Sequence, residues 1–254
     1  MNKKLFLVIL TVILFFLVAD SIAQQKSTSI PFPKISLDVG TAQTGNDVSV
    51  TLQILLLMPV LSLAPSLIIM TTAYLRIIIV FHFLKSALGT QQMPPSQLLA
   101  GVALFITFFI MAPTWNKVND EALKPLMANQ INVEEAYNKG IEPIRQFMFM
   151  QTRDEDLELF IGLSNQVRPA NRNEISTYIL IPSFVLSELR AGFIMGFFLF
   201  IPFIMVDMIV SSILMAMGMM MMPPMMISLP FKILLFILVD GWNLIIGSLV
   251  RSFS

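Results

Sequence analysis

The residue types that enzymes use for covalent or metal chemistry are almost absent from this sequence. It has no cysteine and a single histidine, His82, so disulfides, thiolate nucleophiles and paired-histidine zinc motifs are excluded. Neither the pattern Gly-x-Ser-x-Gly nor the phosphate-binding pattern Gly-x-x-x-x-Gly-Lys-Ser/Thr occurs. We therefore expect no enzyme, no catalytic residue, no metal site and no cofactor. His82 lies one helical turn from Lys85, and we expect it to be packed or hydrogen-bonded rather than a proton relay.

A cluster of carboxylates near the middle of the chain is the one candidate for a cation site. It consists of Asp154, Glu155, Asp156 and Glu158. Acidic residues also complement the dipole at the start of a helix, and we favour this second interpretation. The segment 152–155, Thr-Arg-Asp-Glu, has the form of a capping box that would begin such a helix.

Charged residues inside otherwise apolar runs form a second group with chemical meaning. Each such charge costs about 2.5–3.5 kcal/mol at the centre of a membrane helix, so it normally faces other protein or a water-filled path. These residues are Arg76, Lys85, Glu188, Arg190, Asp207, Lys232 and Asp240. If the chain folds back near Met221, Asp207 and Lys232 lie at similar depth on opposite arms, and we expect them to be in contact. The alternative is that each meets a different subunit.

The composition is that of a membrane protein. Hydrophobic residues make up 56% of the chain and charged residues 13%, and the formal net charge is zero. The mean hydropathy is +0.79. A chain this apolar is unlike an ordinary soluble domain. The absence of a positive net charge predicts no nucleic-acid partner.

One sequence frame occurs twice, each time between long apolar runs. The frame is Ala-(Leu/Met)-Gly-x-x-x-Met-Pro-Pro, at residues 87–95 and again at 216–224. The simplest interpretation is a duplicated helical hairpin whose tips contain Gly89, Pro94 and Pro95 in the first copy and Gly218, Pro223 and Pro224 in the second. The first tip carries Thr-Gln-Gln between its glycine and methionine, and the second carries only methionine.

The second tip consists largely of Met219, Met220, Met221 and Met222. Methionine is flexible and polarizable, so packing of an irregular core is one explanation. The other is a contact that must change shape. If several copies surrounded one axis, these tips would form a soft apolar constriction that blocks ions and deforms around a passing chain.

The predicted fold is an all-α membrane protein with two long helical hairpins that flank a small helical periplasmic domain. Residues 1–23 have the pattern of a cleavable signal peptide, with cleavage between Ala23 and Gln24, although a retained helix is the alternative. Residues 24–51 are expected to form a flexible periplasmic leader, residues 52–113 the first hairpin, residues 114–181 the periplasmic domain and residues 182–254 the second hairpin.

Local signals refine this plan. The first arm, residues 52–88, should bend near Pro59 and Pro65, and the second arm should cover residues 96–111. Helix-compatible runs in the central domain cover residues 133–150 and 154–164. Arg76 and Lys85 lie toward the Gly89 tip, so the positive-inside rule places this tip in the cytoplasm and the central domain in the periplasm.

Several motifs together resemble the FliP family, the P subunits of the flagellar type III protein export gate. The first half is similar in residues 75–80 (LRIIIV), 87–90 with Pro94 and Pro95, and 104–113 (LFITFFIMAP). The second half is similar in residues 187–193 (SELRAGF), 206–212 (VDMIVSS), the methionine tip, 229–232 (LPFK) and 239–242 (VDGW). The central domain is similar in Thr152, Arg153, Asp156, Leu157 and Phe160. The resemblance covers residues 52 to the C-terminus. Ser96 replaces the usual asparagine, and the leader matches nothing.

This resemblance implies a subunit that assembles in several copies, a pentamer in the family, with FliQ-like and FliR-like membrane proteins. The assembly would form the entry portal for unfolded flagellar proteins in the bacterial inner membrane, within the flagellar basal body, next to other membrane proteins of the export apparatus. The resemblance also implies that Met219 to Met222 form a gasket, that the charges in the apolar runs contact other subunits, and that the subunits form a cone that can lie above the bilayer.

Other functions stay open at this point. An independent channel or transporter for small solutes could use Arg76, Asp207 and Lys232 to line a path. A sensor is less favoured because the sequence has no cytoplasmic output module. The resemblance alone does not separate a flagellar subunit from its injectisome homologue.

Overall fold

The structure is a computed structural model, and it describes residues 45–90, 93–164, 169, 171–219 and 223–253. The chain divides into two units, Met1–Ile54 and Leu55–Ser254. The predicted signal peptide, its cleavage site at Ala23 and Gln24, and the leader as far as residue 44 lie outside the described residues. Apart from the first turns of α2, all the helices described below belong to the second unit.

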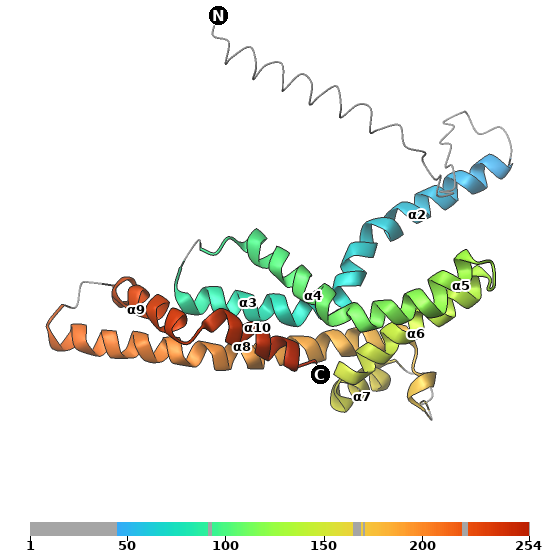
Figure 1. Cartoon of the computed structure of the whole chain (residues 1–254). Helices are drawn as coiled ribbons and strands as arrows, with labels where there is room; N and C mark the ends of the chain where they lie inside the picture. Colours follow the sequence, from blue (N-terminus) through green and yellow to red (C-terminus); the bar gives the residue numbers. More distant parts are fainter. Residues whose placement is uncertain (1–44, 91–92, 165–168, 170, 220–222, 254) are drawn as a thin grey trace, which may run out of the picture. The chain divides into compact units, whose positions relative to one another are not determined.

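Every regular element in the described part of the chain is helical (Figure 1). The helices are α2 (Gly45–Met70), α3 (Tyr74–Leu88), α4 (Ser96–Val118), the π-helical turn η1 (Asn119–Leu123), α5 (Lys124–Met127), α6 (Val133–Gln151), α7 (Asp154–Leu163), the 3₁₀ turn η2 (Arg172–Glu174), α8 (Thr177–Ala216), α9 (Pro224–Leu238) and α10 (Gly241–Arg251). The prediction of an all-α chain is confirmed for these residues.

Helices in the described ranges are long and apolar enough to cross a membrane at two places. They are Ser96–Met127, with 32 residues, and Thr177–Ala216, with 40 residues. Two bent helix pairs satisfy the same criteria when each pair is taken together: Leu57–Met70 with Tyr74–Leu88, bent by 69°, and Pro224–Leu238 with Gly241–Arg251, bent by 62°. By length and composition the described chain therefore contains two to four candidate spans.

The prolines do not mark the helix limits that the sequence predicts. Pro59 and Pro65 lie inside α2, and the first arm breaks at residues 71–73. Pro113 lies inside α4 and Pro182 inside α8, so the hairpin limits expected at 113 and 182 fall within continuous helices. A proline removes one backbone hydrogen bond, and this loss is tolerated where packing and local adjustment hold the rest of a long apolar helix.

The second hairpin returns as two helices rather than one. Its first arm is α8, and its second arm divides into α9 and α10 at Val239 and Asp240. Asp240 adopts the left-handed conformation, with φ of 49°, directly before α10. Because a non-glycine residue rarely takes this conformation inside a helix, it marks a defined break.

The central helices confirm two predicted elements and correct one local detail. α6 and α7 occupy the two helix-compatible runs. The capping box is wrong: α7 begins after Arg153 without a side-chain cap, and the Thr152 hydroxyl donates to the Met148 carbonyl at 2.7 Å instead. Asn132 provides the side-chain cap of α6, since its Oδ1 accepts from the Glu135 N–H at 2.8 Å.

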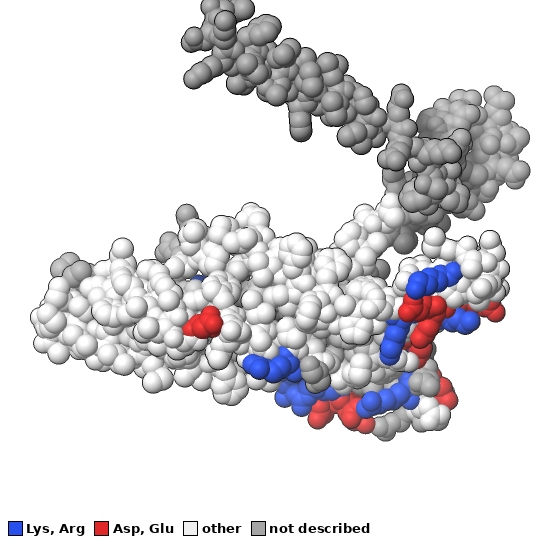
Figure 2. All heavy atoms as spheres, in the orientation of Figure 1, with Lys and Arg blue, Asp and Glu red and all other residues white. Residues whose placement is uncertain are grey.

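The core of the second unit lies where α3 packs along α8 (Figure 1). Ile77, Phe81 and Leu84 on α3 and Phe184 on α8 are buried there. α6 packs against α4 and α8, and α7 packs against α8, so the central helices rest on the long apolar helices. In the view of Figure 2, the charged side chains gather over α5, α6 and α7, and few lie on the surface elsewhere. The periplasmic position of these central helices stays a prediction.

Candidate functional site

The two hairpin tips share one backbone plan. Gly89 and Gly218 both adopt the left-handed conformation, with φ of 72° and 73°. Gly89 directly follows α3, and Gly218 follows α8 after one intervening residue, Met217. Each glycine N–H turns back to the preceding helix, to Ser86 O at 3.1 Å and Met215 O at 3.0 Å. A glycine in this conformation ends a helix without steric cost. The proline pairs then lead into α4 and α9: Pro95 precedes α4, and Pro224 is the first residue of α9.

The methionines around the second tip lie on the surface of the single subunit. Met215, Met217, Met225 and Met226 are all exposed, and Met219 is exposed to a smaller extent. Met220, Met221 and Met222 lie outside the described residues. The described methionines around this tip therefore do not fill the subunit's own core.

Lys232 and Asp207 form the contact that their positions in the sequence predict. Lys232 Nζ lies 2.6 Å from Asp207 Oδ2, with Lys232 on α9 and Asp207 on α8. The Ser228 hydroxyl donates to Asp207 Oδ1 at 2.5 Å. Lys232 also donates to the carbonyl of Ala87, near the end of α3, at 3.1 Å. The pair therefore forms within one chain and also reaches the first hairpin.

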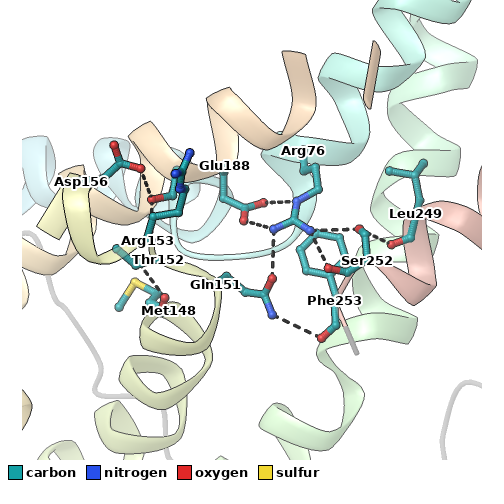
Figure 3. A network of polar contacts seen from close by, with 11 residues as sticks. Arg76, Met148, Gln151, Thr152, Arg153, Asp156, Glu188, Leu249, Ser252 and Phe253 are labelled. Atoms are coloured by element: carbon teal, nitrogen blue, oxygen red, sulfur yellow. Dashed lines mark hydrogen bonds and ion pairs between the residues drawn. The ribbon is translucent and has the colours of Figure 1, made fainter. Parts of the chain in front are cut away.

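A second ion pair joins α3 to α8, and Figure 3 shows its surroundings. The Arg76 guanidinium donates to both carboxylate oxygens of Glu188, with Nε 3.0 Å from Oε2. Arg76 Nη1 donates to the Ser252 carbonyl at 2.8 Å, and Nη2 donates to Gln151 Oε1 at 3.0 Å. The guanidinium also lies over the Phe253 ring, 3.8 Å from its centre. One arginine thus connects α3, α6, α8 and the segment after α10.

Among the described residues, the acidic cluster does not bring together three side chains that could hold a metal ion. Asp156 is buried and accepts a hydrogen bond from the Ser187 hydroxyl at 2.7 Å, and Ser187 Oγ in turn accepts from the Arg153 N–H at 3.1 Å. Asp154 pairs with Arg172 at 2.6 Å. These carboxylates fix α7 against α8 and against the segment before α8.

The remaining predicted residues lie apart from these networks. Lys85 donates to Ser96 Oγ at 3.0 Å across the first tip. Arg190 is exposed and has no ion pair among the described residues, and Asp240 is exposed and accepts from Asn243 Nδ2 at 3.2 Å. His82 is exposed and has no hydrogen bond in the described part of the chain, so no contact within the described subunit supports the expectation that it is packed or hydrogen-bonded.

Sequence reasoning missed the glycines that let α3 approach α8. A Cβ on Gly192 would lie 3.0 Å from Ile79, and one on Gly196 would lie 2.4 Å from Phe83. The spacing Gly-x-x-x-Gly is a known signal for close packing of apolar helices, and it was available in the sequence. Gln151, Ser252 and Phe253 carried no such signal, because their contacts with Arg76 come from distant parts of the chain.

The arrangement can position helices and tips but offers no reaction centre among the described residues. A cavity of about 610 Å³ lies between α8, α9 and α10 and has walls of Phe198, Phe203, Phe236 and other apolar side chains. It brings no nucleophile and base together. The buried charges of the described residues are held by one another, by backbone carbonyls or, for Asp156, by the Ser187 hydroxyl.

Known proteins with similar sequences agree on one family. The FliP family matches residues 57–249. The flagellar biosynthetic protein FliP of Bacillus subtilis is 51% identical over 217 residues, which cover 85% of this chain and 98% of that protein. The proteins of the same name from Borreliella burgdorferi and Treponema pallidum are 46% identical over 249 residues and 45% identical over 233 residues. These alignments cover 94% and 91% of this chain, and 96% and 85% of the respective relatives. With a match of this length and identity, the chain belongs to the FliP family.

Proposed function

We propose that this chain is a core subunit of the flagellar type III export gate. With FliQ-like and FliR-like subunits it would form the pore through which unfolded flagellar proteins cross the bacterial inner membrane. The observation that carries this proposal is the set of exposed methionines on either side of residues 220–222, on one of two matched hairpins, in a chain of the FliP family. The named relatives are flagellar proteins, which supports a flagellum rather than an injectisome.

Met219, Met220, Met221 and Met222 would form the gasket of this pore. Their neighbours Met215, Met217, Met225 and Met226 face outward from the subunit, which supports a contact outside the chain rather than packing within it. Flexible thioether side chains can close around a narrow gap and then adapt to a passing polypeptide. Several copies around one axis, a pentamer by the family resemblance, would bring these tips together.

The alternative of an independent solute channel has less support. It requires Arg76, Asp207 and Lys232 to line a path. The structure instead places Arg76 and Lys232 in buried contacts within the subunit, with Asp207 as the carboxylate partner of Lys232. Charges that are already paired in this way are poorly placed to attract a passing solute. The family also confirms that the chain is a non-enzymatic subunit.

The test replaces the methionine tip in a flagellated bacterium that lacks its own copy of the gene. A chain with Met219 to Met222 changed to Ala should restore secretion of filament protein but raise leakage of small ions across the membrane. The matched control changes Met127 and Met150 to Ala, because these methionines are also exposed but lie on α5 and α6 rather than at the tip. Secretion and leakage should then both equal those of the parent chain.

Two results would contradict the proposal. A tight membrane in the tip variant, with secretion intact, would remove the gasket role. Normal motility and secretion in the strain without the gene would remove the export role itself.

A further inference from the structure

We infer that Lys232 is a positioning residue that ties the first hairpin tip to the second hairpin, so that the ends of α3, α8 and α9 move as one body. The consequence for ion leakage rests on the proposed gate function. The coupling itself does not, because it concerns contacts inside one chain.

The contacts of Lys232 involve three helices. Its ammonium is paired with Asp207 on α8 at 2.6 Å and donates to Ala87 O on α3 at 3.1 Å, while its own backbone belongs to α9. The side chain is only 4% exposed, and Ser228, one turn earlier on α9, is fully buried as it donates to the same carboxylate. An ammonium carries three donors, and two of them are accounted for by groups on two other helices.

The carbonyl that Lys232 binds lies at the end of a helix. The last carbonyls of α3 have no partner within the helix, and the negative end of the helix dipole favours a cation there. Gly89 follows in the left-handed conformation, and a Cβ at this position would lie 3.8 Å from Lys232 Nζ. The lysine therefore binds the point at which the first tip leaves α3.

The two copies of the repeated frame differ at this junction, by which we mean the contacts of Lys232 with Asp207 and with the Ala87 carbonyl. When the two tip frames are aligned, Ala103 occupies the place of Lys232 in the first copy, and Ile78 occupies the place of Asp207. Ala103 is buried in α4. The first hairpin thus has no equivalent ion pair, and the second hairpin uses its own pair to hold the tip of the first.

Burial makes the junction hard to open. Separation of Lys232 from Asp207 would leave an ammonium without its carboxylate in apolar surroundings, which is strongly unfavourable. Movement of one tip should therefore carry the other tip with it rather than break the contact. In a gate, this would keep the tip-facing parts of α8 and α9 dependent on the end of α3.

The test measures the distance between α3 and α9 within one chain. The sequence has no cysteine, so nitroxide labels attach only at introduced cysteines, Ser86→Cys on α3 and Met226→Cys on α9, both at exposed positions. Labelled chains are co-assembled with an excess of unlabelled chains and the partner subunits, purified, and studied by pulsed dipolar spectroscopy. Only distances within a chain then contribute.

The decisive variant is Lys232→Met with Asp207→Leu, which replaces the pair by apolar side chains of similar size and leaves no uncompensated charge. The parent should give a single narrow distance distribution, and the variant should lose it. The control, Lys124→Met with Asp120→Leu, removes an exposed Lys–Asp pair and should match the parent. If the decisive variant is not recovered from membranes, Lys232→Gln with Asp207→Asn removes the same charges and should broaden the distribution as well.

An unchanged narrow distribution in either variant overturns the coupling. Ion leakage is measured on the same variants in cells. A broadened distribution without extra leakage would leave the coupling intact and count against the gasket, so the two proposals fail separately.

Discussion

Arg76 shows how a charge is accommodated in an apolar part of this chain. Its guanidinium binds Glu188, Ser252 and Gln151 and lies against the Phe253 ring. Glu188 is fully buried, so its carboxylate depends on this one arginine for compensation among the described residues. A bidentate pair of this kind is strong, but its larger effect is the cost of removing one partner.

We predict that Arg76→Met destabilises the subunit by about 3–5 kcal/mol, because Glu188 is left buried without a cation. The loss should appear as a lower unfolding temperature of the detergent-solubilised protein, followed by tryptophan fluorescence. The double change Arg76→Met with Glu188→Leu should recover most of it. Asp120→Asn, at an exposed pair, should change stability by less than about 1 kcal/mol. If Arg76→Met were as stable as the parent chain, the Arg76–Glu188 pair would not be what holds α3 to α8.

At the level of helices, the approach of α3 to α8 depends on two glycines that leave room for side chains. Ile79 and Phe83, one turn apart on α3, lie against Gly192 and Gly196, one turn apart on α8. Phe83 and Phe193 also meet edge to face, with ring centres 5.5 Å apart. The close approach brings Arg76 within reach of Glu188, so packing and charge pairing support each other here.

We predict that Gly196→Ala costs about 1–3 kcal/mol, because the added methyl group would meet the Phe83 ring and force α3 away from α8. Gly101→Ala on α4 is the matched control, since no atom lies within 4 Å of the added group. It should be neutral, or stabilising by about 1 kcal/mol through helix propensity. Thermal unfolding of both variants in detergent checks the difference. Equal stability of the two would show that the α3–α8 contact tolerates the extra methyl group.

At the level of the whole molecule, many large apolar side chains are exposed on the surface of the subunit. Phe105, Phe108 and Phe109 on α4 and Phe197 and Phe198 on α8 are exposed. A surface of this extent marks contact with lipid or with other proteins. It agrees with a subunit that works only in an assembly.

We predict that the purified chain alone, reconstituted into liposomes, conducts neither ions nor small solutes, because the proposed pore also needs the FliQ-like and FliR-like subunits. Cells that express the chain without FliQ-like and FliR-like subunits should secrete no filament protein, and addition of the partners should restore secretion. Flux measurements and secretion assays provide the readouts. Solute transport by the chain alone would favour the independent channel instead.

The sequence predicted the class of elements more reliably than their limits. Apolar runs and the repeated frame were sufficient for two hairpins, and Gly89 and Gly218 end helices as that frame indicates. Pro113 and Pro182 were poor guides, because a long apolar helix can continue through a proline when its neighbours hold it. The capping pattern at Thr152 also failed, since its hydroxyl bonds backward to Met148.

The Asp207–Lys232 pair could be predicted because both residues lie at similar distances from one turn, so chain reversal alone brings them together. The Arg76–Glu188 pair and the bond from Lys232 to Ala87 could not, because they join separate hairpins. The sequence by itself determined the apolar helices, the matched tips and the family, which follow from local spacing and motif. Only the tertiary structure decided which buried charge meets which, because a buried charge takes the partner that helix packing brings within reach.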